Sequence, residues 1–163
     1  MKENQNRIQW ILILKWGLVL LCAFVIISGA FTNRTSSTSF QDMRKQVVKA
    51  ADLTNMKKAD DQMIRRLYGF DPDSFDGIVL YYPKSNMNAE ELLLVKLKNE
   101  DQRDQMEKTI SNRVATQKKS FKGYGAKQTA MLEKSIVEVR GNYALYISAK
   151  NPEKVKAAFD AAY

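Results

Sequence analysis

The sequence predicts an α+β fold, with an N-terminal transmembrane helix followed by one domain in which a four-stranded antiparallel sheet packs with helices. Three observations support this prediction. Residues 16–31 carry no charged side chain. After them, apolar residues recur at helical spacing in some segments and as short β-branched or aromatic runs in others. Two such runs, at 136–140 and 143–147, are joined by Gly141-Asn142, a two-residue connection typical of a β-hairpin.

The N-terminal apolar stretch predicts a membrane anchor. Extended back to Trp10, it contains 22 residues with Lys15 as the single charge. At about 1.5 Å per residue, this is enough to cross a hydrocarbon core of roughly 30 Å. Lys15 can extend its ammonium group to the membrane interface, where Trp10 and Trp16 are also expected. The alternative is a secretory signal peptide that is cleaved after Ala30.

The flanking charges predict the orientation of this anchor. Basic residues outnumber acidic ones on its N-terminal side, so we expect the N-terminus in the cytoplasm. The chain then divides into a cytoplasmic tail and anchor at 1–31, a polar flexible linker at 32–39 and an exported domain at 40–163. The expected location is the cell membrane, as a single-pass protein with an extracytoplasmic C-terminal domain.

The composition limits the chemistry of the exported domain. The chain has no histidine, and its one cysteine, Cys22, lies in the anchor. This excludes the usual structural zinc sites, His-based triads and thiol nucleophiles. We therefore predict no cofactor and no metal site. One alternative stays open, namely a site for a hard cation. A turn-rich segment contains three carboxylates that suit such a cation as well as hydrogen bonds within the turn: Asp71, Asp73 and Asp76.

The first half of the exported domain predicts two helices and two strands. Apolar residues at helical spacing indicate a helix from 40 to about 52. A second helix begins near Asp60 and ends at Gly69, a residue suited to the left-handed conformation after a helix. A β-branched and aromatic run predicts a strand at 78–82, and 91–97 is expected to return beside it.

The second half predicts a long helix, the hairpin and a final helix. The long helix starts near Asn99 and runs for roughly 20 residues, and 128–134 adds a further helical turn. The last helix begins at Asn151-Pro152. The element order is ααββαββα, with the long and terminal helices expected on the same face of the sheet. One stripe of the long helix is expected to face inward: Met106, Ile110, Val114, Gln117 and Phe121.

Four segments carry a resemblance to a known family: Leu67–Pro72, Lys118–Tyr124, Leu132–Val137 and Arg140–Ser148. In this order and spacing they resemble a domain-of-unknown-function family found in membrane- or lipid-anchored exported proteins, mostly of Gram-positive bacteria. The similarity covers about 40–163. It implies a single exported domain without established catalytic residues. Because members are often encoded near membrane-bound O-acyltransferases, it also implies cell-surface polymer modification as a setting.

A basic cluster near the end of the long helix is the first candidate site. It consists of Arg113, Lys118, Lys119, Lys122 and Lys127. Such a cluster is expected to contact anionic lipid headgroups or an anionic polymer. The alternative is a solvated helix end, since cations in the last turn complement the helix dipole.

Tyrosines on or beside the strands are the second candidate. Tyr81 and Tyr82 are neighbours on a strand and must point to opposite faces, so one of them is expected in the core. Tyr82 and Tyr124 are the candidates for an exposed ligand surface.

Together these patterns predict a membrane-anchored, non-enzymatic binding or accessory domain. Its expected partners are the lipid bilayer and an envelope protein or anionic cell-surface polymer, and not nucleic acid. The alternative function is an enzyme or catalytic accessory in cell-surface polymer acylation, which a buried carboxylate pair in an open cleft would favour. An apolar exposed sheet face would instead favour a structural partner of a membrane complex.

Overall fold

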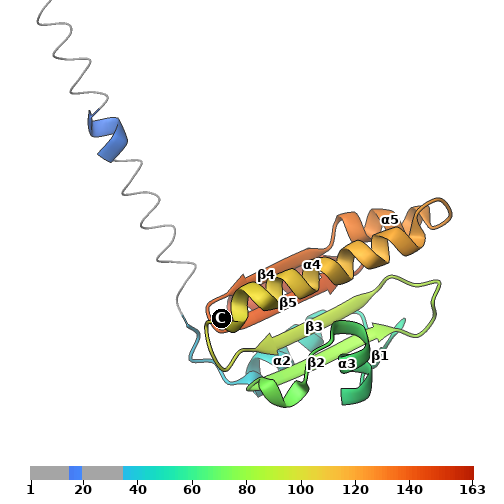
Figure 1. Ribbon diagram of the computed structural model, residues 1–163, viewed down its shortest axis with the longest axis horizontal. Coiled ribbons are helices and arrows are strands. Elements are labelled where there is room, and N and C mark those ends of the chain that lie inside the picture. Colours follow the sequence, from blue (N-terminus) through green and yellow to red (C-terminus); the bar gives the residue numbers. More distant parts are fainter. Residues whose placement is uncertain (1–14, 20–34) are drawn as a thin grey trace, which may run out of the picture. The chain divides into compact units, whose positions relative to one another are not determined.

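The computed structural model describes residues 15–19 and 35–163, which belong to two separate units, 1–34 and 35–163. Residues 15–19 are helical, and Trp16 is 65% exposed. Within these described ranges, no helix is both long and apolar enough to span a bilayer. Most of the anchor expected between Trp10 and residue 31 lies outside the described residues. The second unit is shown in colour in Figure 1.

The second unit is an α+β domain built on a five-stranded antiparallel sheet. The strand order in space is β1-β2-β3-β5-β4. The predicted mixed α+β class and the antiparallel sheet are therefore confirmed. The strands are β1 (Met56–Lys58), β2 (Gly77–Pro83), β3 (Glu91–Lys96), β4 (Ile136–Arg140) and β5 (Tyr143–Ser148).

The prediction of four strands is wrong, because β1 adds a fifth at the edge of the sheet. β1 has only three residues, and Met56 is its single buried side chain. It pairs with the end of β2, where Met56 lies opposite Pro83 and Lys58 opposite Tyr81. A strand so short and so polar carries no alternating pattern, so only its pairing with β2 defines it.

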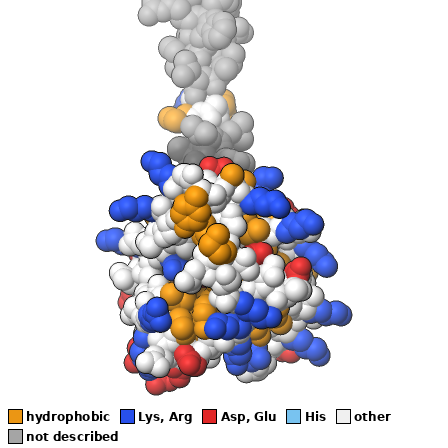
Figure 2. Space-filling model, turned by 90° about the vertical axis from the view of Figure 1, so that its right-hand side faces the viewer, with side chains coloured by type: hydrophobic (Ala, Val, Ile, Leu, Met, Phe, Trp, Pro, Cys, Tyr) orange, Lys and Arg blue, Asp and Glu red, His pale blue; other side chains and the backbone are white. Residues whose placement is uncertain are grey.

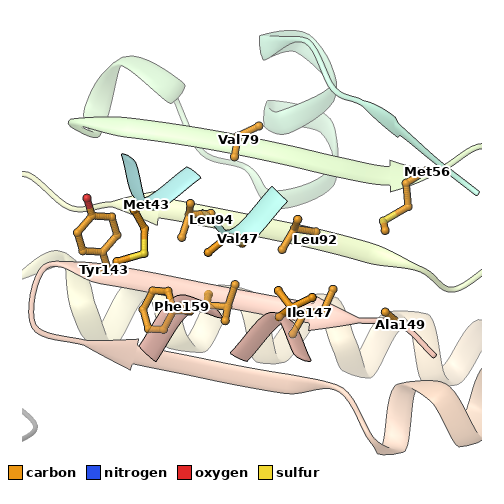
Figure 3. Packing of buried hydrophobic residues seen from close by; sticks show 12 residues of the cluster. Met43, Val47, Met56, Val79, Leu92, Leu94, Tyr143, Ile147, Ala149 and Phe159 are labelled. Atoms are coloured by element: carbon orange, nitrogen blue, oxygen red, sulfur yellow. The ribbon is translucent and has the colours of Figure 1, made fainter. Parts of the chain in front are cut away.

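Helices cover both faces of the sheet. The helix α2 (Phe40–Ala50) and the C-terminal helix α6 (Pro152–Ala162) lie on one face. Figure 3 shows Met43, Val47 and Phe159 from these helices pointing towards strand residues that include Leu92 and Ile147.

The opposite face is covered by α3 (Asp61–Tyr68) and α4 (Gln102–Phe121). The short helix α5 (Ala126–Glu133) packs against the end of α4, and the one-turn helix η1 (Pro72–Ser74) follows α3. The expectation that the long and terminal helices share one face is therefore wrong, and the sheet has no bare face. The reason is visible in the central strands, whose unbroken apolar runs at 92–95 and 143–147 bury side chains on both sides.

Local signals set the helix and hairpin ends as predicted. The Asp60 carboxylate accepts a hydrogen bond from the Met63 amide at 2.8 Å and caps α3. Gly69 ends that helix with φ 70°, and Gly141 turns the β4–β5 hairpin with φ 51°.

Residues 35–39, which the sequence assigned to the flexible linker, are hydrogen-bonded to the domain. The Asn142 side chain accepts from the Ser36 amide at 2.9 Å and donates to the Ser36 carbonyl at 3.1 Å. The Ser36 hydroxyl donates to the Tyr163 carbonyl at 2.7 Å, and the Thr38 hydroxyl donates to the Ala162 carbonyl at 2.6 Å. The hairpin turn and the C-terminus thus hold the start of the domain in place.

Candidate functional site

A cleft of about 450 Å³ lies where the β2–β3 connection meets the C-terminal half of α4. β1, the end of β2, α3 and the segment after α4 supply the rest of its lining. The β2–β3 and α4–α5 connections lie at the same end of the sheet, on the right of Figure 1. Figure 2 views that end and shows lysine and arginine side chains around exposed apolar ones.

The lining of this cleft carries positive charge only. Lys57 on β1, Arg66 on α3, Lys84 after β2 and Arg113 on α4 contribute to it, and no Asp or Glu is among the lining residues. The Lys84 ammonium donates to the Thr54 carbonyl at 2.9 Å, which holds it beside the start of β1. The cleft is therefore suited to an anion.

Beneath the cleft lies a fully buried carboxylate, that of Glu91 at the start of β3. Its Oε1 atom accepts from the Tyr68 hydroxyl at 2.5 Å and from Arg113 Nε at 3.0 Å. Its Oε2 atom accepts from Arg113 Nη2 at 2.6 Å and from Gln117 Nε2 at 2.9 Å. The Tyr146 hydroxyl donates to Gln117 Oε1 at 2.8 Å, which closes the network. We call these five residues the Glu91 network.

Two helices on one face of the sheet and two strands position the Glu91 network. Arg113 and Gln117 are four residues apart on α4 and so project from the same side of the helix. Tyr68 ends α3, and Glu91 and Tyr146 lie on the adjacent strands β3 and β5. The network therefore joins two helices to the centre of the sheet.

The protonation states of this network follow from its burial. Burial, and then the negative charge of Glu91, raises the pKa of Tyr68 well above its ordinary value. The same two causes raise the pKa of Tyr146. Burial alone would lower the pKa of Arg113, but the hydrogen bond and charge of Glu91 outweigh it and the pKa is raised. Both tyrosines are thus neutral donors and Arg113 stays charged at neutral pH.

The charge of Arg113 is therefore compensated inside the protein. Its side chain is 16% exposed and forms a bidentate pair with a carboxylate that is 0% exposed. Arg113 was predicted to belong to a basic cluster that contacts an anion, with a solvated helix end as the alternative, whereas here its side chain is mostly buried. The positive charge available to a ligand comes from Lys57, Arg66 and Lys84, all of which are exposed.

Both tyrosines proposed as a ligand surface line this cleft. Tyr82 is partly buried, and the Lys57 ammonium lies 5.0 Å from the centroid of its ring. Tyr124 is 65% exposed, and its ring packs against Phe121 at a centroid distance of 6.0 Å. Tyr81 instead packs against the core cluster on the opposite face of the sheet, as expected for its neighbour on the strand.

The remaining residues of the predicted basic cluster lie outside the cleft lining. Lys118 lines a shallow hollow between α4 and β4, and Lys122 lines another beside α5. Among the described residues, no ion pair involves Lys118, Lys119, Lys122 or Lys127. Sequence proximity thus brings these lysines together at the helix end, but the structure separates them from the cleft. Of the predicted membrane-interface residues, Trp10 lies outside the described range.

The residues that define the cleft share no sequence pattern that would have identified them. Lys57, Arg66 and Lys84 lie on β1, on α3 and after β2, and the fold brings them together. Glu91 was assigned to the start of a strand without a role. One signal was available, because a polar Gln117 occupied the inward stripe of α4 and therefore needed a buried partner.

The surroundings of the buried Glu91 carboxylate are relevant to the alternative of an enzyme. Within residues 15–19 and 35–163, Glu91 is the only fully buried carboxylate, and its partner is a cation rather than a second acid. The buried carboxylate pair that would favour an enzyme is therefore not observed in this part of the chain. The described residues also contain no group of three or more potential metal ligands, and Asp71 pairs with Arg65 at 2.8 Å.

Residues 49–149 match the family described as Domain of unknown function (DUF4358), and the chain belongs to this family. The matched range includes the sheet, α3 to α5 and every residue of the cleft lining. No curated protein and no solved structure matches the chain.

Proposed function

We propose that residues 35–163 form a non-enzymatic binding domain that holds an anionic group of a cell-envelope partner in the cleft above the Glu91 network. The N-terminal apolar stretch would anchor this domain outside the cytoplasmic membrane. That location is supported by the uncharged run at 16–31 and by the excess of basic residues before it.

One observation carries the proposal, namely the charge of the cleft lining. Cations from β1, α3 and the β2–β3 connection converge on one concavity that no acidic side chain lines. Lysines spread over a surface are solvated and need no ligand. Cations that come from separate elements and surround a cleft with aromatic walls instead support a site for a specific anion.

The cleft and the start of the domain lie at opposite ends of β3. The domain begins beside the far end of β3, where the Lys96 ammonium donates to the Thr38 carbonyl at 2.9 Å. The cleft lies at the other end of β3, where its lining residues Arg113 and Gln117 contact Glu91. At about 3.3 Å per residue, the strand separates the two by roughly 17 Å.

Charge reversal tests the proposal with a matched control in the same chain. We expect the triple variant Lys57→Glu, Arg66→Glu, Lys84→Glu to lose affinity for long-chain polyphosphate at low salt. The loss should be at least about tenfold, because one charge-assisted hydrogen bond is worth about 1.5 kcal/mol or more. The control triple variant Lys118→Glu, Lys119→Glu, Lys122→Glu changes the net charge equally at the end of α4, outside the cleft lining.

The two variants separate specific binding from a general charge effect. Equal losses would mean that net charge rather than the cleft attracts the anion, and a larger loss in the control would place the site on the helix end. Far-UV circular dichroism of both variants in the full chain checks that each is folded. Rising salt concentration should weaken binding by the wild type, since salt screens the attraction between the cations of the cleft and the anion.

A further inference from the structure

The cleft lining contains more than cations, and its other groups indicate the chemistry of the ligand. We propose that the ligand is a phosphorylated carbohydrate, bound as one hydroxyl-bearing unit of an anionic glycan. This inference rests on the proposed function, because it assigns a ligand class to the same cleft. Neutral hydrogen-bonding groups, the tyrosine rings of the lining and the size of the cleft each support it.

The neutral polar groups of the lining come from two elements. Asn86 and Asn88 lie on the β2–β3 connection, and Thr116 and Ser120 lie one turn apart on α4. Among the described residues, no hydrogen bond uses the side-chain amide of Asn86 or Asn88, so both can donate to and accept from a ligand. The Thr116 and Ser120 hydroxyls donate to α4 carbonyls and keep their acceptor capacity. Mixed donors and acceptors of this kind match hydroxyl groups, which both donate and accept.

The aromatic groups provide surfaces for the apolar faces of a sugar ring. Tyr124 is 65% exposed although Phe121 beneath it is 5% exposed, so the pair offers a ring supported from below. Tyr82 lies in the same lining with Lys57 against its ring. A tyrosine side chain combines an apolar ring with a polar hydroxyl, which suits a sugar ring with hydroxyl groups on its edges and apolar faces.

The charge distribution of the cleft indicates where the phosphate and where the sugar would bind. The charge of Arg113 is already compensated by Glu91, so this part of the cleft needs no anion from the ligand. Lys57, Arg66 and Lys84 are exposed and uncompensated by any acid of the lining. The phosphate therefore belongs at the exposed cations and the hydroxyl-bearing body beside the amides and rings.

The size of the cleft favours a single sugar unit over a protein surface. Its volume of about 450 Å³ lies within the range of roughly 300–1,000 Å³ typical of small-molecule sites. A stable protein interface instead needs about 800 Å² of surface on each partner. A concave site of this size suits one residue of a polymer.

Calorimetric titration of the full chain tests this ligand class with three small probes: glucose 6-phosphate, inorganic phosphate and glucose. The chain is held in a polyoxyethylene detergent, because a sugar headgroup would compete. We expect glucose 6-phosphate to bind at least about tenfold more tightly than either of the other probes, since only it engages both parts of the cleft.

Substitution of the aromatic surface gives a second, independent measurement. Tyr124→Ala should weaken glucose 6-phosphate binding several-fold and leave inorganic phosphate unchanged. Met87→Ala is the matched control, because Met87 is 60% exposed at the same end of the domain but lies outside the cleft lining. The large exposure of both side chains makes a folding defect an implausible cause of any difference.

The outcomes distinguish this inference from the proposed function. Equal affinities for glucose 6-phosphate and inorganic phosphate would overturn the carbohydrate assignment and leave the anion site standing. Binding of neither phosphate probe by the wild type, or identical binding by the Lys57, Arg66 and Lys84 charge-reversal variant, would overturn both. Binding of an acidic peptide in preference to glucose 6-phosphate would assign the cleft to a protein partner instead.

Discussion

Replacing Glu91 by glutamine should destabilise the domain more than any other change of a single charge in it. The Glu91 carboxylate is fully buried and accepts four hydrogen bonds, two of them from the Arg113 guanidinium. Glutamine keeps one oxygen but turns the other position into a donor, which then faces donors of Tyr68, Arg113 or Gln117. Arg113 also loses its counter-ion while it remains largely buried.

The magnitude follows from these lost contacts. Breaking a buried ion pair by removing one partner costs about 3–5 kcal/mol, and hydrogen bonds to charged groups contribute about 1.5–3 kcal/mol each. Because glutamine retains one acceptor and the shape of the side chain, we expect the free energy of unfolding to fall by about 3 kcal/mol.

Urea unfolding of the full chain, followed by far-UV circular dichroism, measures this difference. Glu90→Gln is the matched control, because Glu90 is the adjacent residue and makes one exposed hydrogen bond, with Asn55 at 3.1 Å. We expect the control to change the free energy by less than about 1 kcal/mol. Similar values for the two variants would refute the claim that the Glu91 network joins α3 and α4 to the sheet.

Two further predictions concern the N-terminal segment and alkaline pH. Asn142→Ala removes both hydrogen bonds to the Ser36 backbone, so the free energy of unfolding measured in urea should fall by about 1–3 kcal/mol. An unchanged free energy would contradict the claim that the hairpin turn holds residues 35–39 in place. Burial raises the pKa of Tyr143 to about 12, whereas an unfolded tyrosine ionises near pH ~10. The unfolded chain therefore loses its proton first, and stability is full below about pH 10 and declines as pH rises towards about 12. A Tyr143→Phe variant should show a shallower decline in unfolding free energy over this range, and an equal slope would contradict the assignment.

Local signals explain which parts of the fold were predictable. Gly69 and Gly141 take positive φ values, and the Asp60 side chain caps a helix, so each marks a boundary through the chemistry of one residue. The long helix, whose inward stripe includes Met106 and Ile110, was found because its pattern repeats over many turns. These elements needed no information from the rest of the chain.

Features that depend on pairing between distant segments were not predictable in this way. β1 is a strand because the end of β2 offers it hydrogen-bonding partners, not because of its own pattern. The covering of both sheet faces was signalled by the unbroken apolar runs of β3 and β5, but the pattern does not say which helix takes which face.

The residues of the candidate site also fall into those that a local pattern identified and those that only the fold brings together. Tyr82 and Tyr124 were identified because aromatic residues beside strands are candidates for an exposed surface, and both line the cleft. Arg113 was predicted to contact an anionic ligand together with the lysines of the basic cluster, because the sequence pattern does not show that Glu91 is its partner. The three exposed cations of the cleft lie on elements that the fold alone brings together.

Photocrosslinking in the native membrane tests most directly whether the cleft is where a partner binds. A photoreactive side chain is placed at Asn86, which lines the cleft, and separately at Gln46, which is exposed on α2 across the sheet. The account predicts that the Asn86 position captures a phosphate-bearing glycan and that the Gln46 position does not. Capture of that glycan from both positions equally, or only from Gln46, would contradict the claim that this cleft is the binding site.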